Sequence, residues 1–225
     1  MNQKSPPKGV FILCAGGHAR VVTSILKENG IIPTGMTDTD PSRSGTEVNG
    51  IPIIGADNLI VNQSPHEVVL VNAMGNAPGR GRSDLEKRET LYSKFKKLGF
   101  EFLEIISPSA AISDQVVLQE GCHIMTGAVV HPGTTVGANT IINTGASLDH
   151  DCHVGPHCHV APGAVLCGGV VIGCRCHIGA GAVVIPGVAI GDDAVVGAGA
   201  VVIRDVAAGA TVTGNPASVV TDRRS

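Results

Sequence analysis

The chain has 225 residues, a formal net charge of −3 at pH 7, 30 glycines, no tryptophan and only 2% aromatic residues. This length has room for two modest domains. The small negative charge gives no electrostatic basis for binding nucleic acid or an anionic membrane surface. No apolar stretch approaches the ~18 residues of a membrane span, and the N-terminus has no hydrophobic signal core, so we expect a cytoplasmic protein.

The first hundred residues predict alternating strands and helices. Apolar runs predict short strands at residues 10–14, 31–36, 48–54 and 67–73. A helix is expected over 18–28, and a second one begins at the capping box of Ser83 and Glu86 and ends at Gly99. Strand–helix alternation of this kind indicates a small, Rossmann-like parallel sheet.

The turn after the first strand is the expected ligand site of this sheet. Parallel sheets bind ligands where strands end and helices begin, and the free N–H groups of a helix N-terminus attract phosphate. Here the turn runs from Cys14 to His18, and Cys14 and Ala19 stand where the dinucleotide fingerprint has glycine. Asp38, after the second strand, is placed to read a ribose or a base edge. A tight turn and a solvated acid explain the same residues equally well. Residues 75–82, rich in Gly and Arg, end another strand and are a weaker candidate for closing over the same ligand.

From residue 110 onward the sequence repeats with a period of six. Every sixth residue from Ile112 to Val202 is Ile, Val or Leu, and the residue two positions earlier is small. This period is the signature of a parallel β-helix, in which three hexapeptides make one triangular coil. Residues two apart on a strand point to the same side, so each unit sends one small and one branched side chain inward. Glycines that follow the branched residue, such as Gly137 and Gly155, are expected to provide the unusual backbone angles of the corners.

The two patterns predict an α/β domain at 1–106 and a left-handed parallel β-helix of hexapeptide repeats at 107–225. Burial of the branched column cannot by itself offset the entropy of ordering the coil backbone. Ladder hydrogen bonds, capped ends and side-by-side association of prisms are expected to supply the rest. A flat-faced triangular prism packs well around a threefold axis, which favours a homotrimer.

Seven cysteines raise the question of disulfides or metal binding. Four of them fall in the small inward column and are interpreted as apolar fillers: Cys122, Cys152, Cys158 and Cys176. Cys167 and Cys174 lie outside this column, and the pattern assigns them no role.

The candidate chemistry lies in the middle of the repeats, where residues 150–159 contain four histidines. His153 and His159 directly precede inward residues, so both are expected to point outward. His150 and His157 fall at corners. No histidine of this group is expected inside the core, so the structural alternative is a solvated surface.

His150 beside Asp151 is suited to act as a general base. The reference pKa of an imidazole lies near ~6.5, and an adjacent carboxylate stabilises the imidazolium that forms. A thioester carbonyl also needs a donor where negative charge develops, and His159 and the backbone N–H of Gly168 are candidates. No Ser–His–acid arrangement is apparent, so direct attack by a substrate amine or hydroxyl is simpler.

Taken together, these motifs give a chain that resembles the hexapeptide-repeat sugar O- and N-acetyltransferases of the sialic acid and bacillosamine type, including the UDP-4-amino-sugar N-acetyltransferases. The resemblance rests on residues 15–22, Asp38, Gly75-Asn76, 143–161 and 214–217. It implies acetyl-CoA as co-substrate, a nucleotide-activated amino sugar as substrate, sites between the subunits of a homotrimer, and no metal.

The resemblance also implies roles for individual residues. His150 would be the base, Asp151 would raise its basicity, Asn143 would join them as a catalytic residue, and His159 would contact acetyl-CoA. The other implied ligand-binding positions are Gly168, Ala180 and Ala198 for the coenzyme, and Gly16, Gly17, His18, Asp38 and Gly75 for the nucleotide sugar.

The expected function is acetyl transfer to the 4-amino group of a UDP- or GDP-linked dideoxy sugar, in cell-surface polysaccharide biosynthesis. Sugar O-acetylation is the close alternative. A different class is a trimeric zinc-dependent hydratase of the γ-carbonic-anhydrase type, with His153, His159 and His177 as ligands. A non-catalytic scaffold is the third possibility.

Overall fold

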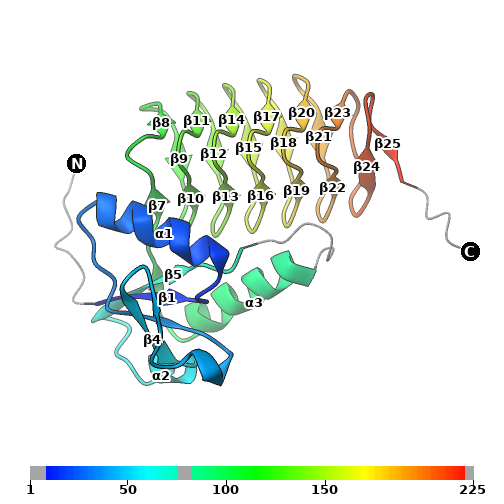
Figure 1. The fold of residues 1–225 in the computed structure, drawn as a ribbon. Helices are drawn as coiled ribbons and strands as arrows, with labels where there is room; N and C mark the ends of the chain where they lie inside the picture. The colour runs from blue at the N-terminus through cyan, green and yellow to red at the C-terminus, as the bar shows by residue number, and fades with distance from the viewer. Residues whose placement is uncertain (1–8, 76–82, 221–225) are drawn as a thin grey trace, which may run out of the picture. The chain divides into compact units, whose positions relative to one another are not determined.

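The computed structural model describes residues 9–75 and 83–220. These residues form two compact units that divide between Ile105 and Ile106, drawn as a ribbon in Figure 1. The rest of the loop that Gly75 opens, residues 76–82, lies outside the described residues. Within the described parts of the chain, no helix is long and apolar enough to cross a membrane.

The first unit is built on a six-stranded sheet with the order β3-β4-β2-β1-β5-β6. Its pairs are parallel except for β3 and β4, which are antiparallel. The strands are β1 (Gly9–Leu13), β2 (Gly35–Thr37), β3 (Glu47–Val48), β4 (Ile51–Gly55), β5 (Val68–Asn72) and β6 (Glu101–Phe102). The helices are α1 (Gly17–Glu28), the 3-10 helix η1 (Pro41–Arg43), α2 (Asn58–Val61) and α3 (Ser83–Lys97).

The predicted strands and helices of this unit are present, and their boundaries follow local chemistry. All residues of β1 are buried, as expected for a central strand of a parallel sheet. The second strand begins at Gly35 and not at Ile31, because Pro33 cannot donate a hydrogen bond to a neighbouring strand. Ile32, counted as part of that strand from its hydrophobicity, is 75% exposed. Beyond the end of α3, Gly99 has a φ of +87°, a backbone conformation common just past a helix.

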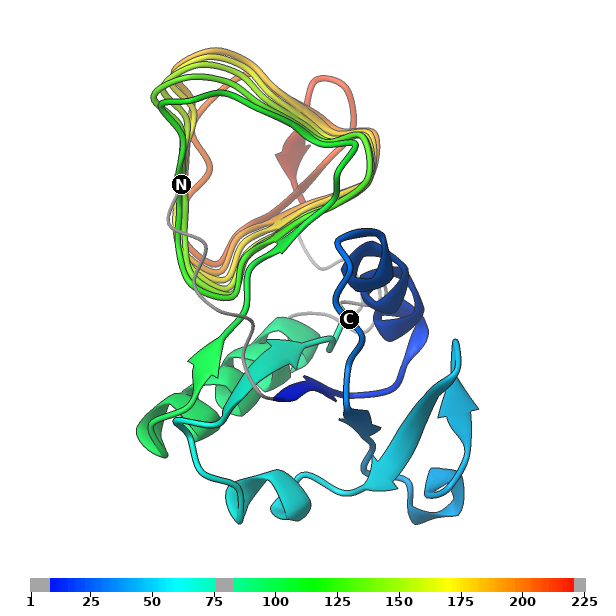
Figure 2. The same ribbon diagram turned by 90° about the vertical axis from the view of Figure 1, so that its left-hand side faces the viewer.

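The second unit is a parallel β-helix whose strands form three faces of a triangular prism, seen end-on in Figure 2. The first face contains β7 (Ile105–Ile106), β10 (His123–Ile124), β13 (Ile141–Ile142), β16 (His159–Val160), β19 (His177–Ile178), β22 (Val195–Val196), β24 (Thr211–Thr213) and β25 (Ser218–Val219). The second face contains β8 (Ala111–Ile112), β11 (Val129–Val130), β14 (Ser147–Leu148), β17 (Val165–Leu166), β20 (Val183–Val184) and β23 (Val201–Val202). The third face contains β9 (Val117–Leu118), β12 (Thr135–Val136), β15 (His153–Val154), β18 (Val171–Ile172) and β21 (Ala189–Ile190).

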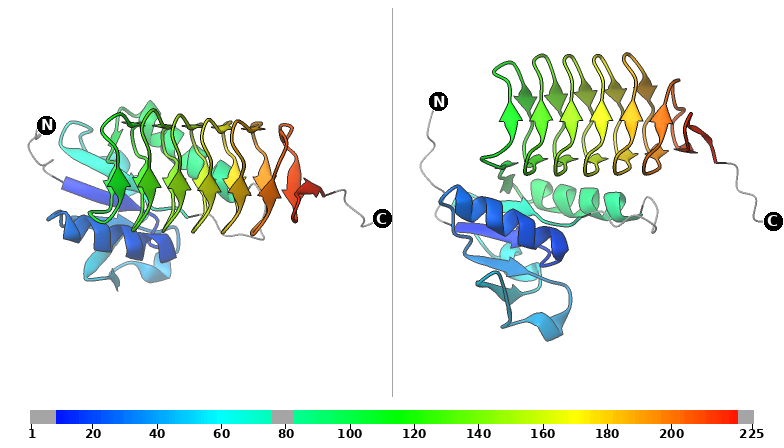
Figure 3. Two further views of the ribbon diagram at one scale, coloured as in Figure 1. Left: turned by 90° about the horizontal axis from the view of Figure 1, so that it is seen from above. Right: turned by 45° about the horizontal axis from the view of Figure 1, so that its top comes forward.

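The chain turns a corner between consecutive faces, so the prism has three edges. We call the edge between the first and second faces the first edge, that between the second and third faces the second edge, and that between the third and first faces the third edge. The pairing from coil to coil is regular, for example Val136 with Val154 and Ile142 with Val160. Figure 3 shows the resulting stack of coils from two further directions. Any residue of the repeat can therefore be assigned to a face or to an edge.

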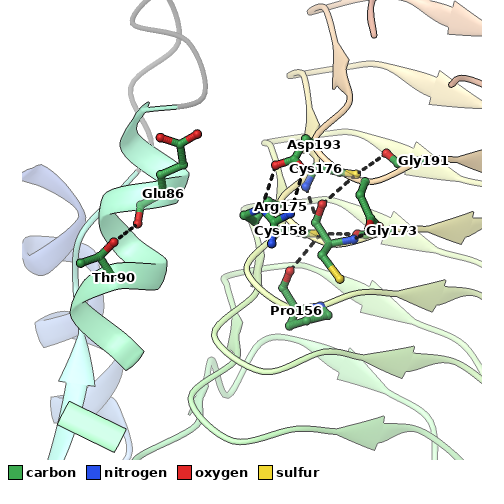
Figure 4. A network of polar contacts seen from close by, with 11 residues as sticks. Glu86, Thr90, Pro156, Cys158, Gly173, Arg175, Cys176, Gly191 and Asp193 are labelled. Carbon is green, nitrogen blue, oxygen red and sulfur yellow. Dashed lines mark hydrogen bonds and ion pairs between the residues drawn. The ribbon is translucent and has the colours of Figure 1, made fainter. Parts of the chain in front are cut away.

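The interior of the prism confirms the expected columns. The branched column from Val130 to Val202 is buried, and the four cysteines interpreted as fillers are fully buried and form no disulfide within the described residues. The Sγ of Cys158 donates to the Gly173 carbonyl at 2.9 Å, and that of Cys176 donates to the Gly191 carbonyl at 3.1 Å (Figure 4). Figure 4 also shows a pair at the third edge, in which Arg175 binds Asp193.

The expectation for the corner glycines was wrong about their role. Gly137 and Gly155 do not have a positive φ; the left-handed residue of each unit lies two positions later, as at Asn139 (φ +57°) and His157 (φ +61°). Gly137 is required by coil stacking instead. A Cβ on this residue would lie 2.4 Å from the backbone carbon of Gly155 in the next coil.

Candidate active site

The second edge carries His150 and Asp151 at the corner between β14 and β15. The Nδ1 of His150 lies 2.9 Å from Oδ2 of Asp151, and the two side chains are 63% and 70% exposed. Asp151 occupies the left-handed corner position, with a φ of +60°. The imidazole is thus held by a carboxylate on the surface of the prism, as the hexapeptide pattern predicts.

Two carboxylates act on this imidazole, and only Asp151 was expected from the sequence. The hydrogen bond that His150 donates to Asp151 is the largest influence that raises the pKa of His150, and the charge of Asp149 raises it further. The Oδ1 of Asp149 also accepts the backbone N–H of His150 at 2.8 Å, which fixes the corner. The signal that was missed is an acid directly before the corner histidine.

Gly168 lies in the next coil at the same edge, directly against the imidazole. A Cβ on Gly168 would be 2.6 Å from Nε2 of His150. The neighbouring N–H of Gly169 donates to the His150 carbonyl at 2.9 Å, so the two corners are stacked. The structure therefore brings together His150 and Gly168, and the lack of a Cβ on Gly168 leaves room for the ring in this position.

Asn143 and His159 form a second pair, located toward the first edge. The Nδ2 of Asn143 lies 2.9 Å from Nε2 of His159. Within one chain Asn143 therefore lies with His159 and not with His150. The reason is topological: Asn143 directly follows β13 on the first face, whereas His150 follows β14 on the second.

His159 also differs from its expected exposure. It takes the outward position of β16, in register with Ile141 and His177, yet it is only 5% exposed. Its ring centroid lies 5.2 Å from that of His177. His159 therefore keeps the outward position expected for it but is buried, and burial also lowers the pKa of His177.

The alanines expected to line the coenzyme groove lie at the first edge. Ala180 and Ala198 are both exposed, and the N–H of Gly199 donates to the Ala180 carbonyl at 2.9 Å, so they occupy adjacent coils. Gly168 and His150, by contrast, belong to the second edge. In one chain the predicted coenzyme residues are thus divided between two edges of the prism.

The three histidines named for a zinc site do not lie together within one chain. His153 is exposed on the third face, where its Nδ1 lies 3.1 Å from the Asp151 carbonyl, whereas His159 and His177 lie on the first face. Among residues 9–75 and 83–220, no three His, Cys, Asp or Glu side chains of this chain are grouped to hold a metal. The fourth histidine of the group is His157 at the third edge, where its Nδ1 lies 3.0 Å from Nδ2 of Asn139.

The first unit presents the Cys14–His18 turn at the end of β1. Cys14 has a φ of +71°, a conformation typical of glycine, at the position where the dinucleotide fingerprint has its first glycine. Gly16 caps α1 without a side-chain hydrogen bond, and the space beside Gly16 and Gly17 is open. A Cβ on Gly75 would lie 3.1 Å from the Cβ of His18, so the ends of β1 and β5 meet at this turn.

Burial shifts the pKa values of two side chains in this turn. Burial, with a smaller contribution from the charge of Arg88, lowers the pKa of His18 to about 3, so its imidazole is neutral at pH 7. Burial, followed by the charges of Asp57 and Asp38, raises the pKa of Cys14 to about 12. The turn therefore carries no charged side chain of its own.

Asp38 lies beside the same turn, held by a partner that sequence reasoning missed. Its Oδ2 forms an ion pair with Nη1 of Arg43, and its Oδ1 accepts the N–H of Asp40 at 3.0 Å. The Nη2 of Arg43 donates to the Ala15 carbonyl at 2.9 Å, which links Asp38 to the turn. Arg43 lies in η1, an element that the hydrophobic pattern does not predict.

Family models match both halves of the chain. The PglD N-terminal domain matches residues 9–83, and the bacterial transferase hexapeptide (six repeats) matches residues 133–168 and 169–204. Comparison with curated proteins gave no significant match.

Solved structures resemble the chain over nearly its whole length. A perosamine N-acetyltransferase from Caulobacter crescentus, in complex with CoA and GDP-perosamine, is 38% identical with a TM-score of 0.87, covering 95% of this chain and 97% of that one. The acetyltransferase domain of PglB from Neisseria gonorrhoeae, in complex with acetyl coenzyme A, is 32% identical with a TM-score of 0.86, covering 95% and 100%. WeeI from Acinetobacter baumannii is 27% identical with a TM-score of 0.82, covering 94% and 99%. The chain therefore belongs to the hexapeptide-repeat sugar N-acetyltransferases, which join a PglD-type N-terminal domain to a left-handed β-helix.

Proposed function

We propose that the chain transfers the acetyl group of acetyl-CoA to the amino group of a nucleotide-linked 4-amino-dideoxy sugar. The observation that carries this proposal is the imidazole of His150, exposed at a prism edge, bonded to Asp151 and packed against Gly168. The similar structures with CoA, acetyl coenzyme A and GDP-perosamine support it. The cytoplasmic location and the role in cell-surface polysaccharide synthesis belong to the same proposal.

The geometry of His150 favours direct transfer without an acyl-enzyme. Because Nδ1 faces the Asp151 carboxylate, it carries the proton and Nε2 keeps a free electron pair. The amine attacks the thioester carbonyl, Nε2 accepts the proton that the amine loses, and a C–N bond forms. The C–S bond then breaks and CoA leaves as a thiolate, which takes up a proton.

The coenzyme site is proposed to lie between two copies of the chain in a homotrimer. His150 and Gly168 lie at the second edge, whereas Asn143, Ala180 and Ala198 lie at or next to the first. One groove can contain all of these residues only if the second edge of one copy meets the first edge of another. His159, beside Asn143, would then come from the neighbouring copy to contact acetyl-CoA and the developing oxyanion.

The nucleotide portion is proposed to bind at the turn of the first unit. The open backbone at Gly16 and Gly17, together with the N-terminus of α1, suits a diphosphate. His18 is neutral and lies against Gly75, so both can contact an uncharged part of the ligand. Asp38 remains the candidate to read the ribose or the base.

O-acetylation is compatible with the same base, so the test must separate amine from hydroxyl acceptors. We would measure thiol release from acetyl-CoA with UDP- and GDP-linked 4-amino sugars and with the matching 4-hydroxy sugars. The expected result is CoA release and an acetylated product, detected by mass spectrometry, with amino sugars only. CoA release with the hydroxy sugars alone would favour O-acetylation. If none of the acceptors raises CoA release above the rate in buffer, the proposal is contradicted.

A further inference from the structure

Arg88 is a fully buried cation in the first unit, a position that is costly for a guanidinium unless its hydrogen bonds are well placed. It projects from α3 to the end of β5, where its Nη1 donates to the carbonyls of Asn72 at 2.6 Å and Met74 at 2.7 Å. These are short, charge-assisted hydrogen bonds.

Asn72 completes the contact from the other side. Its buried side chain donates from Nδ2 to the Arg88 carbonyl at 3.0 Å and accepts the N–H of Met74 through Oδ1 at 3.2 Å. Asn72 is also paired with Leu13 at the end of β1. Arg88 and Asn72 thus form a reciprocal clamp, which fixes the chain directly before Gly75.

The clamp lies behind the turn that is proposed to bind the nucleotide sugar. Gly75 is one residue beyond Met74 and lies against His18 in the first turn of α1. Burial lowers the pKa of His18 and raises that of Cys14, whereas the Arg88 charge lowers both. The positive charge therefore reaches both ends of the turn, where the N–H groups of α1 already favour an anion.

We propose that Arg88 is a positioning residue of the nucleotide-sugar site, which holds Gly75 against His18 and adds a fixed positive charge behind the diphosphate. This inference rests on the proposed function for its ligand class. It concerns the strength of nucleotide binding and leaves the chemistry at His150 unchanged. A merely structural arginine would instead affect both substrates alike, through stability.

The test is Arg88→Met and Arg88→Lys, with Lys87→Met as the matched control that removes a positive charge from an exposed neighbour on α3. Calorimetry would measure Kd for GDP, UDP and acetyl-CoA, and steady-state kinetics would measure KM for both substrates. For Arg88→Met we expect Kd for the nucleoside diphosphate that wild type prefers to rise roughly tenfold or more, with acetyl-CoA affinity unchanged. Arg88→Lys keeps the charge but loses the planar fork, so it should be intermediate.

A folded Arg88→Met variant with wild-type affinity for the diphosphate would overturn the inference. If that variant does not fold, Arg88→Lys takes its place: wild-type affinity of this variant for the diphosphate would overturn the inference. Its unfolding midpoint would be measured to confirm that it is folded. The proposed function fails separately: wild type would then bind GDP or UDP but transfer no acetyl group, while the effect of Arg88 on diphosphate affinity would still be measurable.

Discussion

His150 is the residue on which the proposed chemistry depends, and its pKa is directly measurable. Asp151 and Asp149 stabilise the imidazolium, so the pKa of His150 lies above its usual 6.5. The base must be neutral to act, so kcat/KM should rise with pH through that raised pKa. Asp151→Asn removes the charge and weakens the hydrogen bond that raises the pKa, so the rise should move to lower pH. A pH–rate profile of both proteins checks this shift.

The control for this profile is Asp114→Asn, which removes an exposed carboxylate at the second edge, two coils before His150. It changes the net charge equally and should leave the midpoint in place. A midpoint that moves equally in both variants would mean that Asp151 acts only through overall charge.

Gly168 is expected to support catalysis because it leaves space for the imidazole ring of His150. Gly168→Ala places a Cβ 2.6 Å from Nε2 of His150, so the ring must swing away. Since Gly168 does not have a positive φ, alanine brings no backbone strain, and the unfolding midpoint should change little. We expect kcat to fall by roughly tenfold to a hundredfold.

A double-mutant cycle identifies the cause of that loss. In a His150→Ala background, Gly168→Ala should cost nothing more, because no ring remains to be displaced. Equal losses in both backgrounds would show that the alanine blocks a ligand instead.

Among individual residues, the sequence predicts the location of those whose place is fixed by the hexapeptide repeat. The period of six predicts that His150 stands at a corner beside Asp151, and the structure places it there. Arg43 and Arg88 were not predicted, because each acts through carbonyls distant in sequence, at Ala15 and at Asn72. Such contacts depend on how the sheet brings strands together, which no local pattern encodes.

At the scale of the coil, two kinds of glycine should respond differently to substitution. Gly137→Ala puts a Cβ 2.4 Å from backbone of the next coil, where no side chain can move aside. Gly163 has a φ of +68° and open space around it, and Asn139 shows that asparagine adopts this corner conformation. We expect a loss of unfolding free energy of about 3 kcal/mol for Gly137→Ala and about 1 kcal/mol or less for Gly163→Asn. Denaturant unfolding measures both, and equal losses would contradict the stacking argument.

The hexapeptide pattern predicts the direction of a side chain more reliably than its exposure. His153 and His159 occupy equivalent outward positions, yet one is exposed and the other is buried. The period determines which side of the strand a residue takes, but burial depends on neighbours such as Asn143 and His177. The predicted start of strand β2 was wrong for a local reason, because the hydrophobicity of Ile32 was given more weight than Pro33.

For the whole molecule, the distribution of candidate residues over edges is the strongest argument for assembly. Sequence resemblance groups His150, Gly168 and Ala198 in one site, and the topology assigns the first two to the second edge and the third to the first edge. Sequence separation gives no warning of this division, because each hexapeptide turns the chain onto the next face. A site that needs both edges needs two chains.

Complementation between inactive variants tests this division. His150→Ala damages the second edge, and Ala198→Trp fills the exposed first edge. In randomly mixed trimers about a quarter of the sites pair an intact second edge with an intact first edge, so about that fraction of activity should return. Mixing His150→Ala with Gly168→Trp is the matched control, since both damage the same edge and no intact one remains. Acetyl transfer measured after co-expression distinguishes the outcomes. No recovery in either mixture would place the whole site within one chain, and equal recovery in both would contradict the assignment of His150 and Gly168 to the same edge of one site.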